Sequence, residues 1–280
     1  MTNHRPINTA PVAVITGAAR GLGRLTAERL IKRGYCVLLT DVDETVFETA
    51  KALNDRSRHE VWAMQQDVRD PTSHKKISAA ACAKGKLQVW VNNAGILRAG
   101  TSWNYSAADV RLQFEINVLG VIYGCQAAVP AMDRKTGGHI INIASMSALS
   151  PVPGLAIYAA TKHAVLGFST SLQGDLNQAK LPIKVSVICP DTTATQLVAE
   201  VVSDQHSTFL FSNRLLTPES VADAVASVLD NYALLRPVPR SRGLVARLLQ
   251  PWPGFTLRAM KVMSERAQKN RDQYRQNHLG

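Results

Sequence analysis

Three residues of one stretch have side chains that could move a proton: Ser145, Tyr158 and Lys162. The last two are four positions apart in AIYAATKHAVLGFSTSL, a stretch that predicts a helix, and residues at this spacing share one helix face. A free phenol titrates near pH ~10, and a neighbouring ammonium favours its ionised form. The pair therefore predicts a phenol that acts as acid or base near neutral pH. The alternative is an ordinary helix with a buried tyrosine and a solvated lysine.

The elements that would position these residues alternate between short apolar runs and helical patterns. Strands are predicted at 12–16, 36–40, 61–66, 87–91, 139–145 and 183–189, and a long helix at about 107–132. Continuous apolar runs indicate a parallel sheet that is covered on both faces. The sequence thus predicts an α/β fold, a doubly wound parallel sheet of six or seven strands with helices on both faces.

Residues that are candidates for function stand where the predicted strands end. These positions are Gly17, Asp41, Asp67, Asn92, Ser145 and Pro190. Ligands of open parallel sheets bind at the carboxyl ends of the strands. We therefore expect a binding site at this edge of the sheet.

The first strand is followed by a glycine-rich turn, TGAARGLG, whose glycines are Gly17, Gly21 and Gly23. Such glycines let the backbone approach a pyrophosphate, which the start of the next helix attracts, although a plain turn is the alternative. Asp41, at the end of the second strand, could accept hydrogen bonds from ribose hydroxyls or cap the next helix. Its charge would repel the 2′-phosphate of NADP, whereas Arg20 could attract it. We expect NAD.

Taken together, these motifs resemble the short-chain dehydrogenase/reductase family over about residues 10–235. The resemblance rests on TGAARGLG at 16–23, Asp41, Asp67-Val68, NNAG at 92–95, Asn117, Ser145 and the Tyr158–Lys162 pair. It implies a Rossmann-like sheet, a nicotinamide dinucleotide, hydride transfer and a homodimer or homotetramer.

The resemblance also implies roles for single residues. Tyr158 would be the acid/base and Ser145 would orient the substrate oxygen, while Lys162 would bind the nicotinamide ribose and lower the pKa of Tyr158. Asn117 would hold a proton-relay water, with a purely structural bond as the alternative. The implied cofactor-binding residues are Gly17, Arg20, Gly21, Leu22, Gly23, Asp41, Asp67, Val68, Asn93, Ala94, Gly95, Tyr158, Lys162, Pro190, Thr193 and Thr195. One departure is Asp191, because the family usually has glycine after this proline.

Apolar residues surround the predicted site and indicate the kind of substrate. They are Leu197, Val198, Val201, Val202, Phe209, Leu210 and Phe211 in the loop after the sixth strand, with Met146, Leu149, Val152 and Leu155 before Tyr158. No lysine or arginine occurs between Thr192 and Asn213 to bind a carboxylate. We predict a neutral, lipophilic secondary alcohol or ketone; alternatively, these residues only pack a lid onto the core.

Charge divides the chain into a predicted catalytic domain, 1–235, and a basic C-terminal extension, 236–280. The net charge is +11, and the extension has ten lysines and arginines against two acids. The nearly neutral domain gives no indication of nucleic-acid binding. The extension predicts amphipathic helices, which could dock on the domain or a partner subunit, or contact anionic lipid.

Other signals bear on location and cofactors. We see no secretion signal at the N-terminus and no run of 18 apolar residues, and the four cysteines lie far apart. We expect a cytoplasmic protein, at the membrane surface if the extension contacts lipid, and no metal site. The predicted function is an NAD-dependent oxidoreductase for alcohols and ketones. The alternatives are an NADP-dependent carbonyl reductase, or a catalytically idle protein that binds a dinucleotide or a membrane surface.

Overall fold

The computed structural model describes residues 10–279, so the N-terminal segment considered for a secretion signal lies largely outside it. Seven parallel strands form one sheet in the order β3-β2-β1-β4-β5-β6-β7. Their bounds are β1 Pro11–Thr16, β2 Cys36–Asp41, β3 Val61–Gln65, β4 Lys86–Asn92, β5 Gly138–Ile143, β6 Ile183–Pro190 and β7 Leu235–Val238. The predicted doubly wound α/β fold is confirmed.

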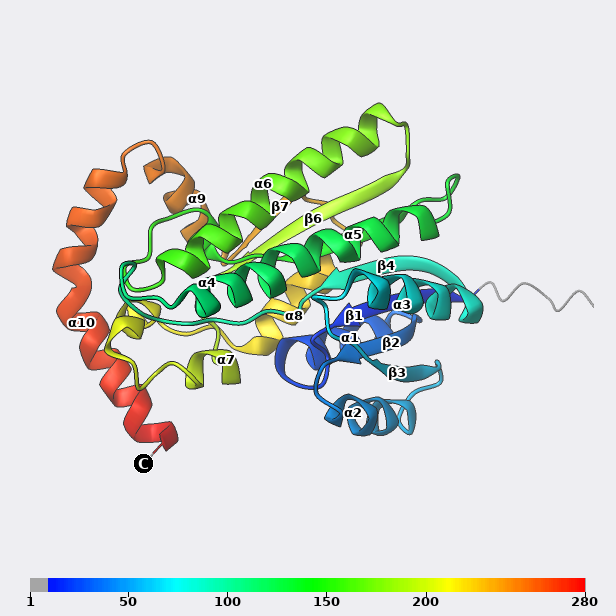
Figure 1. Ribbon diagram of the computed structural model, residues 1–280, viewed down its shortest axis with the longest axis horizontal. Helices are drawn as coiled ribbons and strands as arrows, with labels where there is room; N and C mark the ends of the chain where they lie inside the picture. Colours follow the sequence, from blue (N-terminus) through cyan, green and yellow to red (C-terminus); the bar gives the residue numbers. More distant parts are fainter. Residues whose placement is uncertain (1–9, 280) are drawn as a thin grey trace, which may run out of the picture.

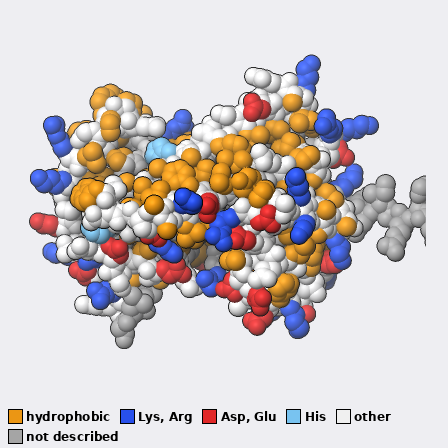
Figure 2. Space-filling model, viewed as in Figure 1, with side chains coloured by type: hydrophobic (Ala, Val, Ile, Leu, Met, Phe, Trp, Pro, Cys, Tyr) orange, Lys and Arg blue, Asp and Glu red, His pale blue; other side chains and the backbone are white. Residues whose placement is uncertain are grey.

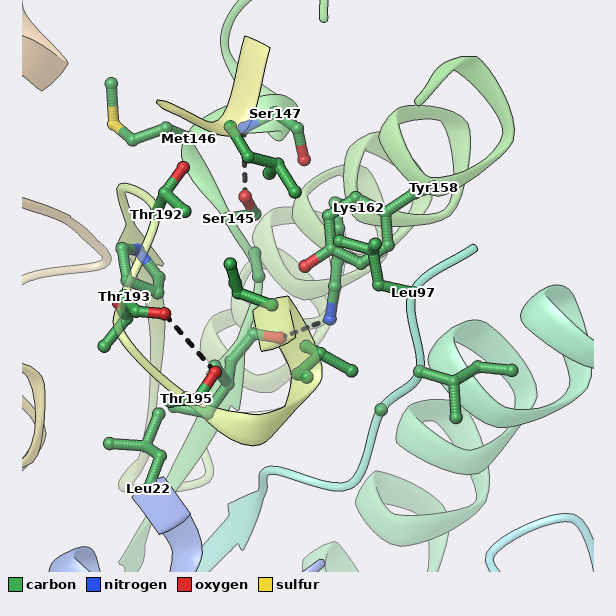
Figure 3. A pocket seen from close by; sticks show the side chains of 18 of the residues that line it. Leu22, Leu97, Ser145, Met146, Ser147, Tyr158, Lys162, Thr192, Thr193 and Thr195 are labelled. Atoms are coloured by element: carbon green, nitrogen blue, oxygen red, sulfur yellow. Dashed lines mark hydrogen bonds between the residues drawn. The ribbon is translucent and has the colours of Figure 1, made fainter. Parts of the chain in front are cut away.

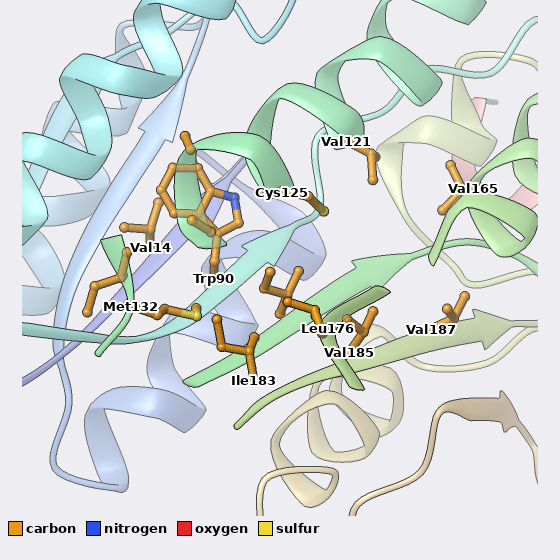
Figure 4. Packing of buried hydrophobic residues seen from close by; sticks show 14 of the residues in the cluster. Val14, Trp90, Val121, Cys125, Met132, Val165, Leu176, Ile183, Val185 and Val187 are labelled. Carbon is orange, nitrogen blue, oxygen red and sulfur yellow. The ribbon is translucent and has the colours of Figure 1, made fainter. Parts of the chain in front are cut away.

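Helices cover both faces of the sheet (Figure 1). They are α1 Gly21–Lys32, α2 Thr45–Asn54, α3 Pro71–Lys84, α4 Ala107–Phe114, α5 Gly120–Ala131, α6 Ala156–Gln178, α7 Gln196–Ala199, α8 Pro218–Ser227, α9 Arg240–Leu249 and α10 Pro253–Leu279. Successive residues of a strand point to opposite faces. Val14 accordingly packs in a core with α3, α5 and α6, while Ile15 packs in a second core with α1, α2 and α8. Figure 4 shows the first core around Trp90, which is fully buried.

The strand order reverses between β1 and β4, because the chain runs outward through β2 and β3 before it returns. At such a reversal the loops leave in opposite directions and open a crevice at the carboxyl ends of the strands. The glycine turn follows β1, and residues 93–95 follow β4, so both border this crevice.

The predicted long helix is continuous from Ala107 to Ala131 but includes a π-helical segment, Glu115–Leu119, which contains Asn117. It is also the one helix of the described residues whose length and apolar composition would suffice to cross a membrane, whereas the sequence analysis expected none. Val121, Cys125 and Ala128 of this helix are buried in the core beside the sheet. These contacts are those of a helix in the protein core. Such a helix can be as long and as apolar as one that crosses a membrane.

The predicted boundary at residue 235 is wrong, because β7 crosses it. Residues 235–238 pair with Val187 to Pro190 of β6 and complete the sheet. The extension therefore begins after this strand, with α9 and α10. Near its C-terminal end, α10 docks on the 3-10 helix η3, Gln205–Phe211: Asn270 Nδ2 donates to the Phe211 carbonyl at 2.9 Å, and the rings of Tyr274 and Phe211 lie 5.3 Å apart.

Candidate active site

A cavity of about 870 Å³ lies at the carboxyl edge of the sheet. Every catalytic and cofactor-binding residue predicted from the sequence lines it, apart from Asn117. Among the strand-end positions, Asn92 does not line it either, because its side chain is buried and donates to Asn142 Oδ1 at 2.8 Å. The cavity is bordered by the glycine turn, the segment after β4, the start of α6 and the loop after β6. Residues that are far apart in the sequence therefore meet in one place, as the strand-end positions predicted.

The glycine turn is packed so closely that larger residues would not fit. Gly17 has a φ of +64°, and a Cβ on it would lie 2.7 Å from the Ala94 Cα. A Cβ on Gly23 would lie 2.2 Å from the Gly17 carbonyl oxygen. Asn93 holds the turn from the other side, because its Nδ2 donates to that same oxygen at 2.8 Å. The turn and the N-terminus of α1 thus form a backbone cradle that suits a phosphate.

Asp41 is half-buried at the end of β2 and lines the cavity. Its carboxylate accepts hydrogen bonds from the backbone N–H of Ala19 at 2.9 Å and of Asp43 at 3.1 Å. Asp41 does not cap the next helix, which was the alternative role considered for it. Instead, Asp43 accepts a hydrogen bond from Thr45 N, the first residue of α2, at 3.0 Å. Asp43 also forms an ion pair with Arg20 at 3.1 Å. Arg20 is therefore drawn toward a neighbouring carboxylate.

Ser145, Tyr158 and Lys162 meet on the opposite wall (Figure 3). Tyr158 and Lys162 lie on one face of α6, with the lysine Nζ 5.5 Å from the centroid of the tyrosine ring. Lys162 is buried and donates to the Ile143 carbonyl at 3.0 Å. Ser145 follows β5, and its Oγ accepts from Ser147 N at 3.1 Å. The alternative of a solvated lysine is wrong.

The environment of Tyr158 in the protein raises its pKa, whereas the prediction was that Lys162 would lower it. Burial raises this pKa to about 12, and hydrogen bonding with Ser145 acts in the opposite direction. Burial also lowers the pKa of Lys162 to about 8. Both shifts have the same cause, because a dry site disfavours the charged form of either group.

Comparisons with known proteins agree with this arrangement. The sequence pattern of the short chain dehydrogenase family matches residues 11–206. The chain belongs to this family of oxidoreductases. 1-Deoxy-11-beta-hydroxypentalenate dehydrogenase of Streptomyces avermitilis is 31% identical over 225 residues, which cover 78% of this chain and 81% of that protein.

Two further relatives define the extent of the similarity. Probable oxidoreductase EphD of Mycobacterium tuberculosis (strain H37Rv) is 31% identical over 240 residues, 80% of this chain, but the match spans only 40% of that protein. A short chain dehydrogenase/reductase from Burkholderia phymatum, solved in complex with NAD, is 28% identical with a TM-score of 0.77. The alignment covers 87% of this chain and 94% of that structure.

In this member of the family, Asn117 is fully buried beside the cavity without lining it. Its side chain accepts from Ile96 N at 2.9 Å, donates to Ile96 O at 2.9 Å and donates to Thr161 Oγ1 at 3.2 Å. These bonds hold the segment after β4 against α6, as the structural alternative predicted. A role in proton relay stays a prediction.

Asp191, the departure from the family pattern, pairs with the C-terminal extension. Its Oδ2 lies 2.6 Å from Nη1 of Arg242 on α9, and its Oδ1 accepts from Thr192 N at 2.8 Å. The turn after β6 thus keeps a local hydrogen bond and gains a tether to the extension. The same turn contributes Thr193 and Thr195 to the cavity wall.

The sequence analysis missed the part of the wall that comes from the extension: Ser241, Arg242, Val245, Ala246 and Met260. It had found no cation in the lid loop, but α9 brings Arg242 there, where Asp191 compensates its charge. It also missed Thr16, whose Oγ1 accepts from the N–H groups of Asn93 and Ala94 at 3.1 Å each. The sequence did contain a signal for the ion pair between Asp191 and Arg242: an acid at the position where the family has glycine, and an extension rich in arginine.

The apolar residues around the site divide between the two roles considered for them. Val202 and Phe211 are buried and pack the lid, whereas Leu149 is buried in the core that contains Trp90; none of the three lines the cavity. Val201 is also buried, beside Tyr158. The remaining predicted residues line the cavity: Leu197, Val198, Phe209, Leu210, Met146, Val152 and Leu155.

Proposed function

We propose that the protein is an NAD-dependent oxidoreductase that interconverts a secondary alcohol and a ketone, both neutral and lipophilic. The observation that carries the proposal is the convergence of Ser145, Tyr158 and Lys162 on the same cavity as the glycine cradle. A dinucleotide in the cradle and a substrate beside Tyr158 would occupy one continuous space. Such continuity is what direct hydride transfer requires.

The cradle fits a dinucleotide because a Cβ on Gly17 or Gly23 would clash with backbone. Asp41 favours NAD, since its half-buried carboxylate can accept from ribose hydroxyls and would repel a 2′-phosphate. Arg20 gives little support to NADP, because Asp43 already pairs with it. The Burkholderia phymatum relative was solved with NAD, which agrees with this choice.

When bound, the nicotinamide supplies the acceptor or donor of hydride. Tyr158 exchanges the proton: its phenolate accepts the hydroxyl proton of an alcohol, and its phenol donates a proton to a ketone oxygen. Ser145 orients that oxygen by a hydrogen bond and stabilises its developing charge. Lys162, held by the Ile143 carbonyl, is still largely protonated at pH 7 because its pKa is about 8.

The protonation state of Tyr158 determines whether the enzyme is ready to reduce a ketone or to oxidise an alcohol. At neutral pH the buried phenol is protonated, which is the form that reduces ketones. Alcohol oxidation needs the phenolate, so it requires added positive charge beside the ring or a higher pH. We therefore expect oxidation to accelerate as the pH rises above neutral, and reduction to be fastest below that range.

The lining of the cavity favours a neutral, lipophilic substrate. Val152, Leu155, Leu197 and Leu210 supply apolar surface near Tyr158, and Met146 also lines the cavity. Arg242, the cation that the extension adds to the cavity wall, is compensated by Asp191. Apolar walls with few polar groups are typical of sites for lipophilic ligands.

The test is nicotinamide reduction with a panel of alcohols graded by size and polarity, using NAD and NADP in parallel. We expect turnover with NAD that increases toward larger, apolar secondary alcohols. Preference for a small acidic or sugar substrate would refute the substrate class, and preference for NADP would indicate the alternative carbonyl reductase. Binding of NAD without turnover on any substrate would indicate the idle dinucleotide-binding protein.

A further inference from the structure

The outer side of the C-terminal extension is unusually apolar for an exposed surface. Seven of the thirteen large hydrophobic side chains that are exposed among the described residues lie between positions 244 and 262. Leu248, Trp252 and Phe255 are 62%, 62% and 60% exposed. Figure 2 shows hydrophobic side chains gathered over the turn between α9 and α10. Exposed apolar groups at this density mark an interaction surface.

The same segment is strongly basic. No Asp or Glu occurs between Asn231 and Ser264, whereas six arginines and lysines do. Arg247, Arg258 and Lys261 are exposed and lie within the apolar segment. We call this surface the apolar–basic patch and define it by Leu244, Arg247, Leu248, Trp252, Phe255, Arg258 and Lys261.

The patch is confined to one part of the extension, because one face of the C-terminal half of α10 packs on the domain and its exposed side chains are polar. Ala267 is fully buried, and Arg271 Nη1 donates to the Gln205 carbonyl at 3.1 Å and to Thr208 Oγ1 at 2.9 Å. Arg242 likewise ties the start of α9 to Asp191. The extension is thus anchored at both ends, and its middle presents the patch outward.

The cavity opens beside the patch. Val245 is 54% exposed and also lines the cavity, so it lies at the mouth. Met260 of α10 lines the cavity as well, next to the exposed Lys261. A surface that covered the patch would therefore lie against this entrance.

We propose that the apolar–basic patch docks the protein on an anionic lipid bilayer, with the cavity mouth next to the membrane. Trp, Phe and Leu flanked by Arg and Lys are the composition of helices that bind the membrane interface. The basic residues are attracted to anionic headgroups. A two-fold dimer through this patch is disfavoured, because such an interface would bring two copies of the same cationic surface together.

Vesicle flotation of the full chain tests the proposal without reference to activity, so its outcome does not depend on the proposed function. We use phosphatidylcholine vesicles with and without phosphatidylserine, at low and high salt. We expect binding to the phosphatidylserine vesicles that weakens with salt. Absence of binding at low salt, or equal binding to both vesicles, would overturn the proposal.

Two variants separate the apolar and the charged contributions. Leu248→Ser/Trp252→Ser removes apolar anchors, and Arg258→Glu/Lys261→Glu reverses charge; none of these side chains lines the cavity. Each pair should weaken vesicle binding by about tenfold or more. The matched controls, Trp103→Ser and Lys75→Glu, change exposed residues elsewhere and should bind as the wild type does.

The patch could instead be covered by a second copy of the chain. The mass of the protein in solution tests this alternative. We expect Leu248→Ser/Trp252→Ser to leave the oligomeric state unchanged in light scattering, with unchanged circular dichroism. A shift to a smaller oligomer without loss of vesicle binding would show that the patch is a subunit interface and would overturn the proposal.

Discussion

Lys162 should destabilise the folded protein at neutral pH, and its replacement by methionine should therefore stabilise it. Burial lowers the pKa of this lysine from 10.5 to about 8. One pKa unit corresponds to ~1.4 kcal/mol, so the shift corresponds to about 3 kcal/mol of unfavourable burial of the charge. Lys162→Met removes this cost, less about 1 kcal/mol for the lost hydrogen bond to the Ile143 carbonyl.

The pH dependence of the difference identifies its cause. Below pH 8 the lysine is protonated in both the folded and the unfolded protein, so the full cost is present. Between pH 8 and 10.5 the unfolded chain binds more protons than the folded one, and the stability of the wild type rises with pH relative to the variant. The advantage of Lys162→Met should therefore be largest at pH 7 and should decline by up to about 3 kcal/mol as the pH approaches 10.5.

Other buried groups shift stability in the opposite direction, but both proteins contain them. Burial raises the pKa of Cys125 and of Cys189 from 9.0 to about 12, and that of Tyr158 from 10.0 to about 12. Each of these groups costs stability as the pH rises above its unfolded value. The comparison of wild type with variant removes these contributions to first approximation. Between pH 7 and 9 they are also small, because these groups are then mostly protonated in both the folded and the unfolded protein.

The assay is urea unfolding followed by circular dichroism at a series of pH values from 7 to 10. The matched control is Lys75→Met, which replaces an exposed lysine on α3 and should show no pH-dependent difference from the wild type. The difference in the free energy of unfolding between Lys162→Met and the wild type should change over this range. A constant difference would refute the reasoning, because it would show that burial does not lower the pKa of Lys162. Catalytic activity should be lost in the same variant.

Four further predictions concern the site. Tyr158→Phe should reduce turnover by about 10²-fold or more while NAD still binds in calorimetry, and turnover within tenfold of the wild type would contradict the acid/base role. Asp41→Ala should raise kcat/KM with NADP relative to NAD, measured on one alcohol; no change would mean that Asp41 does not select the cofactor. The rate of alcohol oxidation should increase with pH above neutral because burial raises the pKa of Tyr158 to about 12, and a profile that falls over this range would contradict the assignment. Asp191→Asn should leave Arg242 uncompensated, so kcat/KM for an alcohol carrying a carboxylate should rise about tenfold relative to its neutral analogue, with the double variant Asp191→Asn/Arg242→Gln as the control that abolishes the gain.

The sequence by itself determined the features that depend on local chain geometry. Tyr158 and Lys162 share a face because they are four positions apart on a helix. The apolar runs determined the parallel sheet, and parallel strands place their carboxyl ends at one edge. For this reason Gly17, Asp41 and Ser145 could be assigned to one site before their positions were known.

Only the tertiary structure decided the features that depend on burial or on distant partners. The direction of the Tyr158 pKa shift follows from the dry environment of the phenol, which spacing along α6 does not specify. The four-residue strand β7 contains Pro237 and carries little strand signal of its own; it is an edge strand that forms because β6 offers a free side. The pairing of Asp191 with Arg242 joins residues 51 positions apart, and it depends on how the extension folds back over the cavity. Such contacts are set by the packing of the whole chain, because the free energy of a buried charge or a long-range ion pair depends on everything that surrounds it.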